Sequence, residues 1–131
     1  MKKVTGIGGI FFKCEDVQAT KDWYEKHLGI EADQYGHTFW QRDVEHPEQK
    51  TSQQWSPFPK DTDYFKPASQ EFMLNYRVEN LDLLLEELKA SGVPIIGEPQ
   101  EFDYGKFGWI LDADGRKIEL WEPKNEDLFE K

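Results

Sequence analysis

The sequence contains a single cysteine, Cys14, among its 131 residues. One thiol cannot form a disulfide within the chain or a zinc site built from several cysteines, so stability must come from packing. No apolar run approaches the roughly 18 to 20 residues that a membrane-spanning helix requires, and the first residues lack the cleavage pattern of a signal peptide. We therefore expect a cytoplasmic protein with no membrane partner.

Basic residues are also scarce. The chain has 16 Lys and Arg against 26 Asp and Glu, which gives a formal net charge of −10. Such a chain repels the phosphate backbone, so nucleic acid is excluded as an expected partner. Aromatic residues are plentiful, with 9 Phe, 5 Tyr and 5 Trp, unlike in a disordered acidic chain. The length then predicts one folded domain.

The two halves of the chain show the same order of structural signals. Residues 7–13 and 72–78 have the pattern of strands, and each run is followed by a helix N-cap residue, Asp16 or Asn80. The caps lie 64 residues apart, and the glycines expected to close the two helices, Gly29 and Gly92, lie 63 apart. A nearly constant separation favours an internal duplication.

Strand patterns return after each predicted helix, so each half is expected to hold one strand, one helix and roughly three further strands. The clearest of these strands cover residues 38–42, 53–55, 107–111 and 117–122. The proline-rich segment 43–70 is expected to contain the longest loops, and residues 112–116 have the composition of a hairpin turn. The charged tail, residues 124–131, is expected to fray.

Two motifs carry a family resemblance. The run Ile7–Ile30 (IGGIFFKCEDVQATKDWYEKHLGI) and the closing run Trp109–Pro123 (WILDADGRKIELWEP) resemble the glyoxalase, bleomycin-resistance and extradiol-dioxygenase proteins, the vicinal oxygen chelate superfamily. The resemblance implies a single α+β domain over residues 1–131, built from two tandem βαβββ modules that form half-barrels around a shared cup. Module one covers about 5–66 and module two about 70–123. Because family members usually pair, it also implies a homodimer.

The resemblance further implies four metal-ligand positions inside the cup, one on the first and one on the last strand of each module. Aligning the two halves gives Gly9, Trp55, Met73 and Glu119 at these positions. Glycine and tryptophan offer no ligand atom, and the methionine thioether is too soft for a hard cation. The three histidines lie at no spacing typical of a metal pair. We therefore expect no catalytic metal and no other cofactor.

Strand alternation predicts which side chains share the cup face. It places Met73, Asn75 and Arg77 on one face of their strand, and Lys117, Glu119 and Trp121 on one face of the last strand. A face that mixes aromatic and polar groups fits a ligand site, with a dimer interface or a solvated face as the alternatives. The residues expected to bind a ligand are Trp40, Arg42, Trp55, Met73, Asn75, Arg77, Trp109 and Trp121.

Two functions remain open. The first is a metal-free protein of the bleomycin-resistance type that binds a small molecule in an aromatic-lined cup. Its ligand would be apolar or aromatic with a cationic or donor group, or anionic or neutral if Arg77 neutralises Glu119. The second is a lyase or isomerase of glyoxalase type, similar to lactoylglutathione lyase, with an unorthodox metal site or with Glu119 as a metal-independent catalytic base. Plain packing of the tryptophans and an ion pair between Glu119 and Arg77 are the structural alternatives.

Overall fold

The computed structural model describes residues 2–130. The chain runs through these elements in order: β1 (Val4–Cys14), α1 (Val17–Leu28), β2 (His37–Arg42), β3 (Lys50–Pro59), β4 (Phe72–Val78), α2 (Leu81–Ala90), β5 (Gln100–Phe102), β6 (Gly105–Leu111), β7 (Lys117–Pro123) and the short 3₁₀ helix η1 (Glu126–Phe129).

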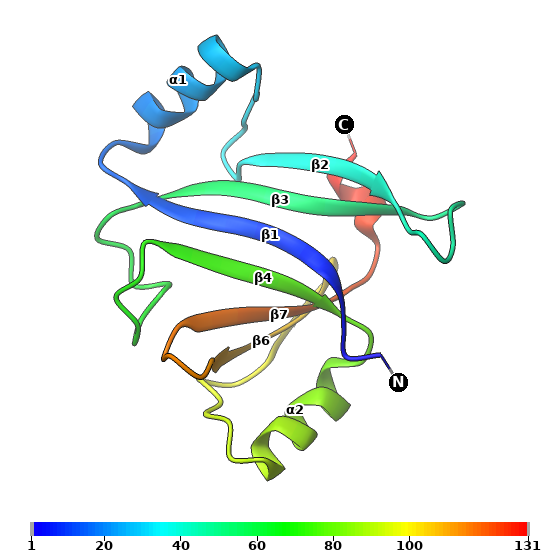
Figure 1. The fold of residues 1–131 in the computed structure, drawn as a ribbon. Helices are drawn as coiled ribbons and strands as arrows, with labels where there is room; N and C mark the ends of the chain where they lie inside the picture. The colour runs from blue at the N-terminus through cyan, green and yellow to red at the C-terminus, as the bar shows by residue number, and fades with distance from the viewer. Residues whose placement is uncertain (1, 131) are drawn as a thin grey trace.

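All seven strands join one curved mixed sheet in the order β2-β3-β1-β4-β7-β6-β5 (Figure 1). β1 pairs in parallel with β3, and β4 pairs in parallel with β7, so the two halves repeat the same connection. β1 and β4 pair antiparallel and join the halves at the centre of the sheet. This arrangement confirms the α+β class and agrees with two half-barrel modules.

The two halves differ in the number of strands that follow the helix. Three strands follow α2, as expected, but only β2 and β3 follow α1. The segment where the missing strand would lie forms an isolated bridge between Asp33 and Gly36. There Asp33 Oδ1 accepts the backbone N–H groups of Tyr35 and Gly36, and this local turn replaces a strand.

β3 is much longer than the sequence pattern predicted. It covers ten residues, Lys50–Pro59, within the segment that was expected to be mostly loop. β3 lies between β1 and β2 in the sheet, so strands on both sides satisfy its backbone groups. The backbone hydrogen bonds of this pairing outweigh the disruptive effect of the prolines. Two of the prolines, Pro57 and Pro59, lie at the end of β3 that does not pair with β2.

Both helices begin at the predicted caps. The side chain of Asp16 accepts the N–H of Ala19, and that of Asn80 accepts the N–H of Leu83. Gly29 then closes α1 in the left-handed region at φ 71°, a conformation that glycine adopts without steric cost.

The two helices differ in how they pack. Leu81, Leu84 and Leu85 of α2 are buried against Ile110 of β6 and Leu120 of β7. In contrast, α1 has no buried residue and touches the sheet near its edge, where Tyr24 contacts Trp55 of β3 (Figure 1). Neither helix in the part of the chain that the structure describes is long and apolar enough to cross a membrane.

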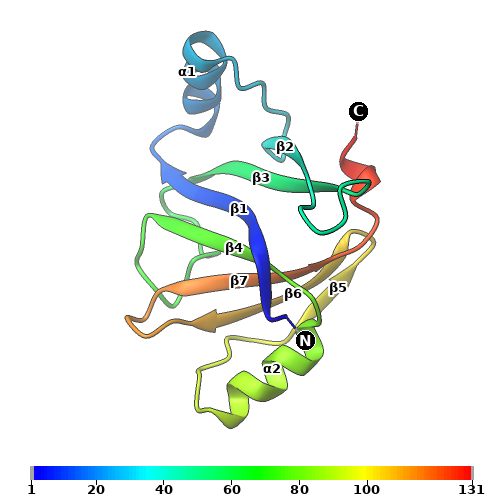
Figure 2. The same ribbon diagram turned by 45° about the vertical axis from the view of Figure 1, so that its right-hand side comes forward.

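Residues 124–130 of the tail do not fray as predicted, and residue 131 lies outside the described residues. Residues Glu126–Phe129 form η1, which returns along the sheet toward β3 (Figure 2). Glu126 accepts hydrogen bonds from Arg77 and Ser52, so a buried ionic contact fixes a segment that looked like a solvated charge run.

Replacing Leu84 by alanine is expected to lower the free energy of unfolding by about 2 to 5 kcal/mol, because it leaves a cavity in the α2 interface. Leu84 is 3% exposed, whereas its neighbour Leu83 is 41% exposed. The Leu83→Ala control should change stability by no more than about 0.5 kcal/mol. Urea unfolding of both variants measures the difference, and equal losses would contradict the packing described here.

Candidate ligand-binding site

A cavity of about 730 Å³ lies inside the curve of the sheet. β1, β3, β4, β6, β7 and η1 all contribute to its wall, together with the loop between β3 and β4. Ten of its lining residues are aromatic: Phe11, Tyr35, Phe58, Tyr64, Phe102, Tyr104, Phe107, Trp109, Trp121 and Phe129. The volume lies in the range of small-molecule sites, and an apolar wall with a few polar groups is typical of them.

The carboxyl group of Glu119 is the main polar group of this cavity. Glu119 is only 2% exposed. Its Oε1 accepts a hydrogen bond from Asn75 Nδ2 at 2.6 Å, and its Oε2 accepts one from Trp109 Nε1 at 2.9 Å. Oε2 also accepts the hydroxyl proton of Tyr64. Three donors from three different elements therefore hold one buried acid in a fixed orientation.

Burial and hydrogen bonding act on Glu119 in opposite directions. Burial raises the pKa of the Glu119 carboxyl, because an ionised group loses its hydration in the protein interior. The donors Tyr64, Asn75 and Trp109 favour the ionised form and partly offset this rise. Burial and the nearby Glu119 charge also raise the pKa of Tyr64 well above its usual range, so Tyr64 remains a proton donor.

Lys117 lies behind the two aromatic donors. It is 8% exposed, and its Nζ donates to the backbone oxygen of Tyr64 at 2.7 Å. The same ammonium lies 5.4 Å from the ring centre of Tyr64 and 5.9 Å from that of Trp109. Burial lowers the pKa of Lys117, and the Glu119 charge opposes this. Lys117 therefore supplies positive charge near the acid from outside the cavity wall.

The strand register sets which residues meet at the centre of the cavity. Gly9 pairs with Gln54 on one side and with Asn75 on the other, and Asn75 pairs with Glu119. The neighbouring Gly8 leaves room for Asn75, because a Cβ at Gly8 would lie 2.1 Å from Asn75 Oδ1. The four central strands thus present glycine, Gln54, Asn75 and Glu119 across the middle of the sheet.

These residues do not fit a divalent metal ion. Glu119 is the single carboxylate at this point, and its oxygens already accept three protein hydrogen bonds, one at Oε1 and two at Oε2. Gln54 Oε1 accepts the hydroxyl of Thr38, and Asn75 Oδ1, a neutral amide oxygen without a hydrogen-bond partner among the described residues, is buried next to Gly8. No group of three or more His, Cys, Asp or Glu converges anywhere in residues 2–130. The donor set is that of a hydrogen-bonded acid, not of a metal centre.

The structure brings four of the residues singled out from the sequence together at this cavity. Asn75, Trp109, Trp121 and Glu119 all line it. Trp109 and Trp121 are 8% and 1% exposed, and each indole N–H has a partner, Glu119 for Trp109 and the backbone oxygen of Tyr104 for Trp121.

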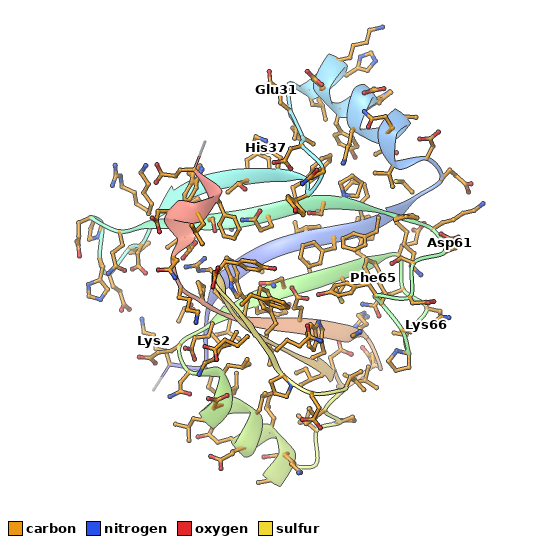
Figure 3. All side chains as sticks on the ribbon, turned by 180° about the vertical axis from the view of Figure 1, so that it is seen from behind. Lys2, Glu31, His37, Asp61, Phe65 and Lys66 are labelled. Carbon is orange, nitrogen blue, oxygen red and sulfur yellow. The ribbon has the colours of Figure 1, made fainter. Side chains whose placement is uncertain are left out.

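The other five predicted residues lie elsewhere, and two of them, Trp55 and Met73, belong to the central strands. Trp55 is on the opposite face of β3, where its ring contacts Phe12 and Tyr24. The register makes Gln54, one residue earlier, the equivalent of Glu119, and a shift of one residue reverses the face. Met73 shares the face of Asn75 but is fully buried beside Phe65, which reaches in from the loop between β3 and β4 (Figure 3).

Trp40 lines a smaller hollow of about 350 Å³. The Lys50 ammonium lies 5.7 Å from the ring centre of Trp40. The two predicted arginines are not among the residues of the main cavity either. Arg42 donates to the backbone oxygen of Pro47 in an exposed loop. Arg77 does not pair with Glu119 but forms an ion pair with Glu126.

The sequence did not predict Tyr64 or any of the other tyrosine and phenylalanine residues that line the cavity. Tyr64 lies in the proline-rich loop, where no strand or helix period assigns a face. Tyr104 lies in a turn that no sequence pattern singled out, and Phe129 lies in the charged tail that was expected to fray. The abundance of aromatic residues was the one signal for them, and it gives no positions.

The model of the Glyoxalase/Bleomycin resistance protein/Dioxygenase superfamily matches residues 6–120. The chain belongs to this superfamily. No curated protein matches the chain in sequence.

Solved structures share the fold at low sequence identity. Methylmalonyl-CoA epimerase from Mycobacterium tuberculosis is 20% identical with a TM-score of 0.61, and the match covers 98% of this chain and 94% of that one. The Streptomyces coelicolor epimerase is 15% identical with a TM-score of 0.68, over 92% and 98%. A Mn(II)-bound glyoxalase from Novosphingobium aromaticivorans is 18% identical with a TM-score of 0.58, over 93% of this chain and 40% of that one.

The raised pKa of Glu119 predicts a pH dependence of stability. In the unfolded chain the Glu119 carboxyl has its ordinary pKa of 4.5. The folded chain therefore keeps the carboxyl proton to a higher pH than the unfolded chain does. The stabilising contribution of Glu119 is therefore complete below 4.5 and is lost as the pH rises through the folded pKa. Glu119→Gln removes this titration, so the variant should gain stability relative to the wild type as the pH rises above 4.5.

Urea unfolding of both proteins across this range measures the effect. Any constant cost of placing an amide among the three donors cancels in the slope with pH. A slope of zero, or one of opposite sign, would show that hydrogen bonding outweighs burial at Glu119.

Proposed function

We propose that this chain binds a small aromatic or apolar molecule bearing a cationic or hydrogen-bond-donating group, without a catalytic metal. The observation that carries this proposal is the single buried carboxyl group, Glu119, at the wall of a cavity rich in aromatic side chains. Aromatic walls bind flat apolar groups at low entropic cost. A partly desolvated acid interacts more strongly with a hydrogen-bond donor or a cation than the same acid does in water.

The charge of the cavity supports this class of ligand. Its lining in the described part of the chain includes two acids, Asp33 and Glu119, and no Lys, Arg or His. Glu119 Oε1 accepts one protein donor, so the oxygen retains capacity for a second donor from a ligand. Arg77, which could have reversed the preference toward anions, is paired with Glu126 instead.

A second candidate is a metal-independent lyase or isomerase with Glu119 as the base. The raised pKa of this buried carboxyl favours it, because a general base works best with a pKa near the working pH. Two of the similar structures are epimerases, and one is a glyoxalase. Deuterium uptake by a bound carbon acid in D₂O, lost in Glu119→Gln, would distinguish catalysis from binding.

Ligand binding can be tested by tryptophan fluorescence, since Trp109 and Trp121 line the cavity. Benzylamine and benzamidine are expected to perturb the emission, whereas benzoate, the matched anion, is not. Glu119→Gln should weaken binding of the amines roughly 10- to 100-fold, the effect of losing a charge-assisted hydrogen bond. Glu130→Gln, which alters an exposed acid, is the control. Equal affinities in Glu119→Gln and the control would refute the assignment of Glu119.

The metal-free part of the proposal has its own test. Elemental analysis of gently purified protein should find no stoichiometric Zn, Ni, Mn or Fe, and calorimetric titration with Mn²⁺ should show no binding at the Glu119 site. Mn²⁺ is the relevant probe because a similar structure is a Mn(II)-bound glyoxalase. One tightly held ion per chain that disappears in Glu119→Ala would overturn this part.

A further inference from the structure

Residues 124–130, here called the C-terminal strap, run from the end of β7 across to β3 (Figures 1 and 2). Leu128 and Phe129 of the strap line the 730 Å³ cavity. The ring centre of Phe129 lies 6.1 Å from that of Trp121 and 5.8 Å from that of Tyr104. The strap therefore supplies part of the aromatic wall.

A buried ionic cluster anchors the strap. Glu126 Oε2 accepts hydrogen bonds from Ser52 N at 2.7 Å, Ser52 Oγ at 2.5 Å and Arg77 Nη1 at 3.0 Å. The side chains of Arg77 and Glu126 are 13% and 14% exposed, and Ser52 is fully buried. Charge-assisted bonds of this kind are strong and directional, and removing one partner leaves the other charge buried and unpaired.

The anchor joins the two halves of the fold. Ser52 lies on β3 in the first half and Arg77 on β4 in the second, while Glu126 follows β7. The Arg77 guanidinium also lies 5.2 Å from the ring centre of Trp121, in the cavity wall. The family match ends at residue 120, so the strap lies outside the part that this chain shares with the superfamily model.

We propose that the C-terminal strap closes one end of the cavity and selects the small molecules that enter it by size. Phe129 is the barrier, and the Glu126–Arg77–Ser52 cluster holds it in place. The size selection rests on the proposed function, because it takes this cavity as the ligand site. The closure itself does not, because any small neutral solute can probe it.

Acrylamide quenching tests the closure without a ligand. In a background with Trp23, Trp40 and Trp55 changed to Phe, the emission comes from Trp109 and Trp121, which are 8% and 1% exposed. Phe129→Ala and Glu126→Gln should each raise the quenching constant several-fold. Glu130→Gln, which breaks an exposed strap ion pair with Lys50, is the matched control and should not.

Unchanged quenching in Phe129→Ala would overturn the proposal. Circular dichroism establishes that each variant is folded. Should Glu126→Gln unfold the chain because Arg77 loses its partner, Phe129→Ala leaves that ion pair intact and still decides the question.

Two amines of different length test the size selection. Phe129→Ala should improve binding of 8-phenyloctylamine relative to benzylamine by about tenfold, whereas Glu130→Gln should leave the ratio as in the wild type. An unchanged ratio in Phe129→Ala would overturn size selection. Increased quenching without binding of either amine to any variant would instead refute the proposed function and leave the closure of the cavity supported.

Discussion

The site depends on one buried acid and the three donors that surround it. Glu119 on β7 accepts hydrogen bonds from Asn75 on β4, Trp109 on β6 and Tyr64 in the loop between β3 and β4. An ionisable group this deep would be costly without partners. Each donor therefore needs its own element at a fixed position, and the sheet register, the loop and the glycines of β1 together provide those positions.

Much of the fold could be predicted from the sequence, because local signals and tertiary structure agree. The caps Asp16 and Asn80 and the closing Gly29 depend on backbone geometry within a few residues, and each acts as expected. The helical spacing of Leu81, Leu84 and Leu85 likewise identifies the packed face of α2. The prediction failed where a distant contact decides the structure, as in β3, which pairs on both sides, and in the strap, which Arg77 binds from another strand.

The site was harder to predict for the same reason. Alternation along β7 gave the face of Glu119 and Trp121 correctly, because a single strand keeps its own period. Finding the equivalent residue on β3 required the register between strands, which the sequence does not give. The prediction was wrong by one residue, so it chose Trp55, which lies on the other side of the sheet, in place of Gln54. Met73 and Arg77 lie on the same face of β4 as Asn75. Phe65, however, packs against Met73, and Glu126 forms an ion pair with Arg77.

The close approach of Gly8 to Asn75 has a consequence for how this sequence can change. A methyl-sized group at position 8 would overlap Asn75 Oδ1, and it would also lie 3.0 Å from Trp121 Cε3. A side chain at position 8 therefore requires the Asn75 side chain to move or to be replaced by a smaller one. Asn75, however, is a partner of Glu119. The two positions are coupled, so an imidazole or carboxylate cannot be added at position 8 by a single substitution while the network around Glu119 is kept.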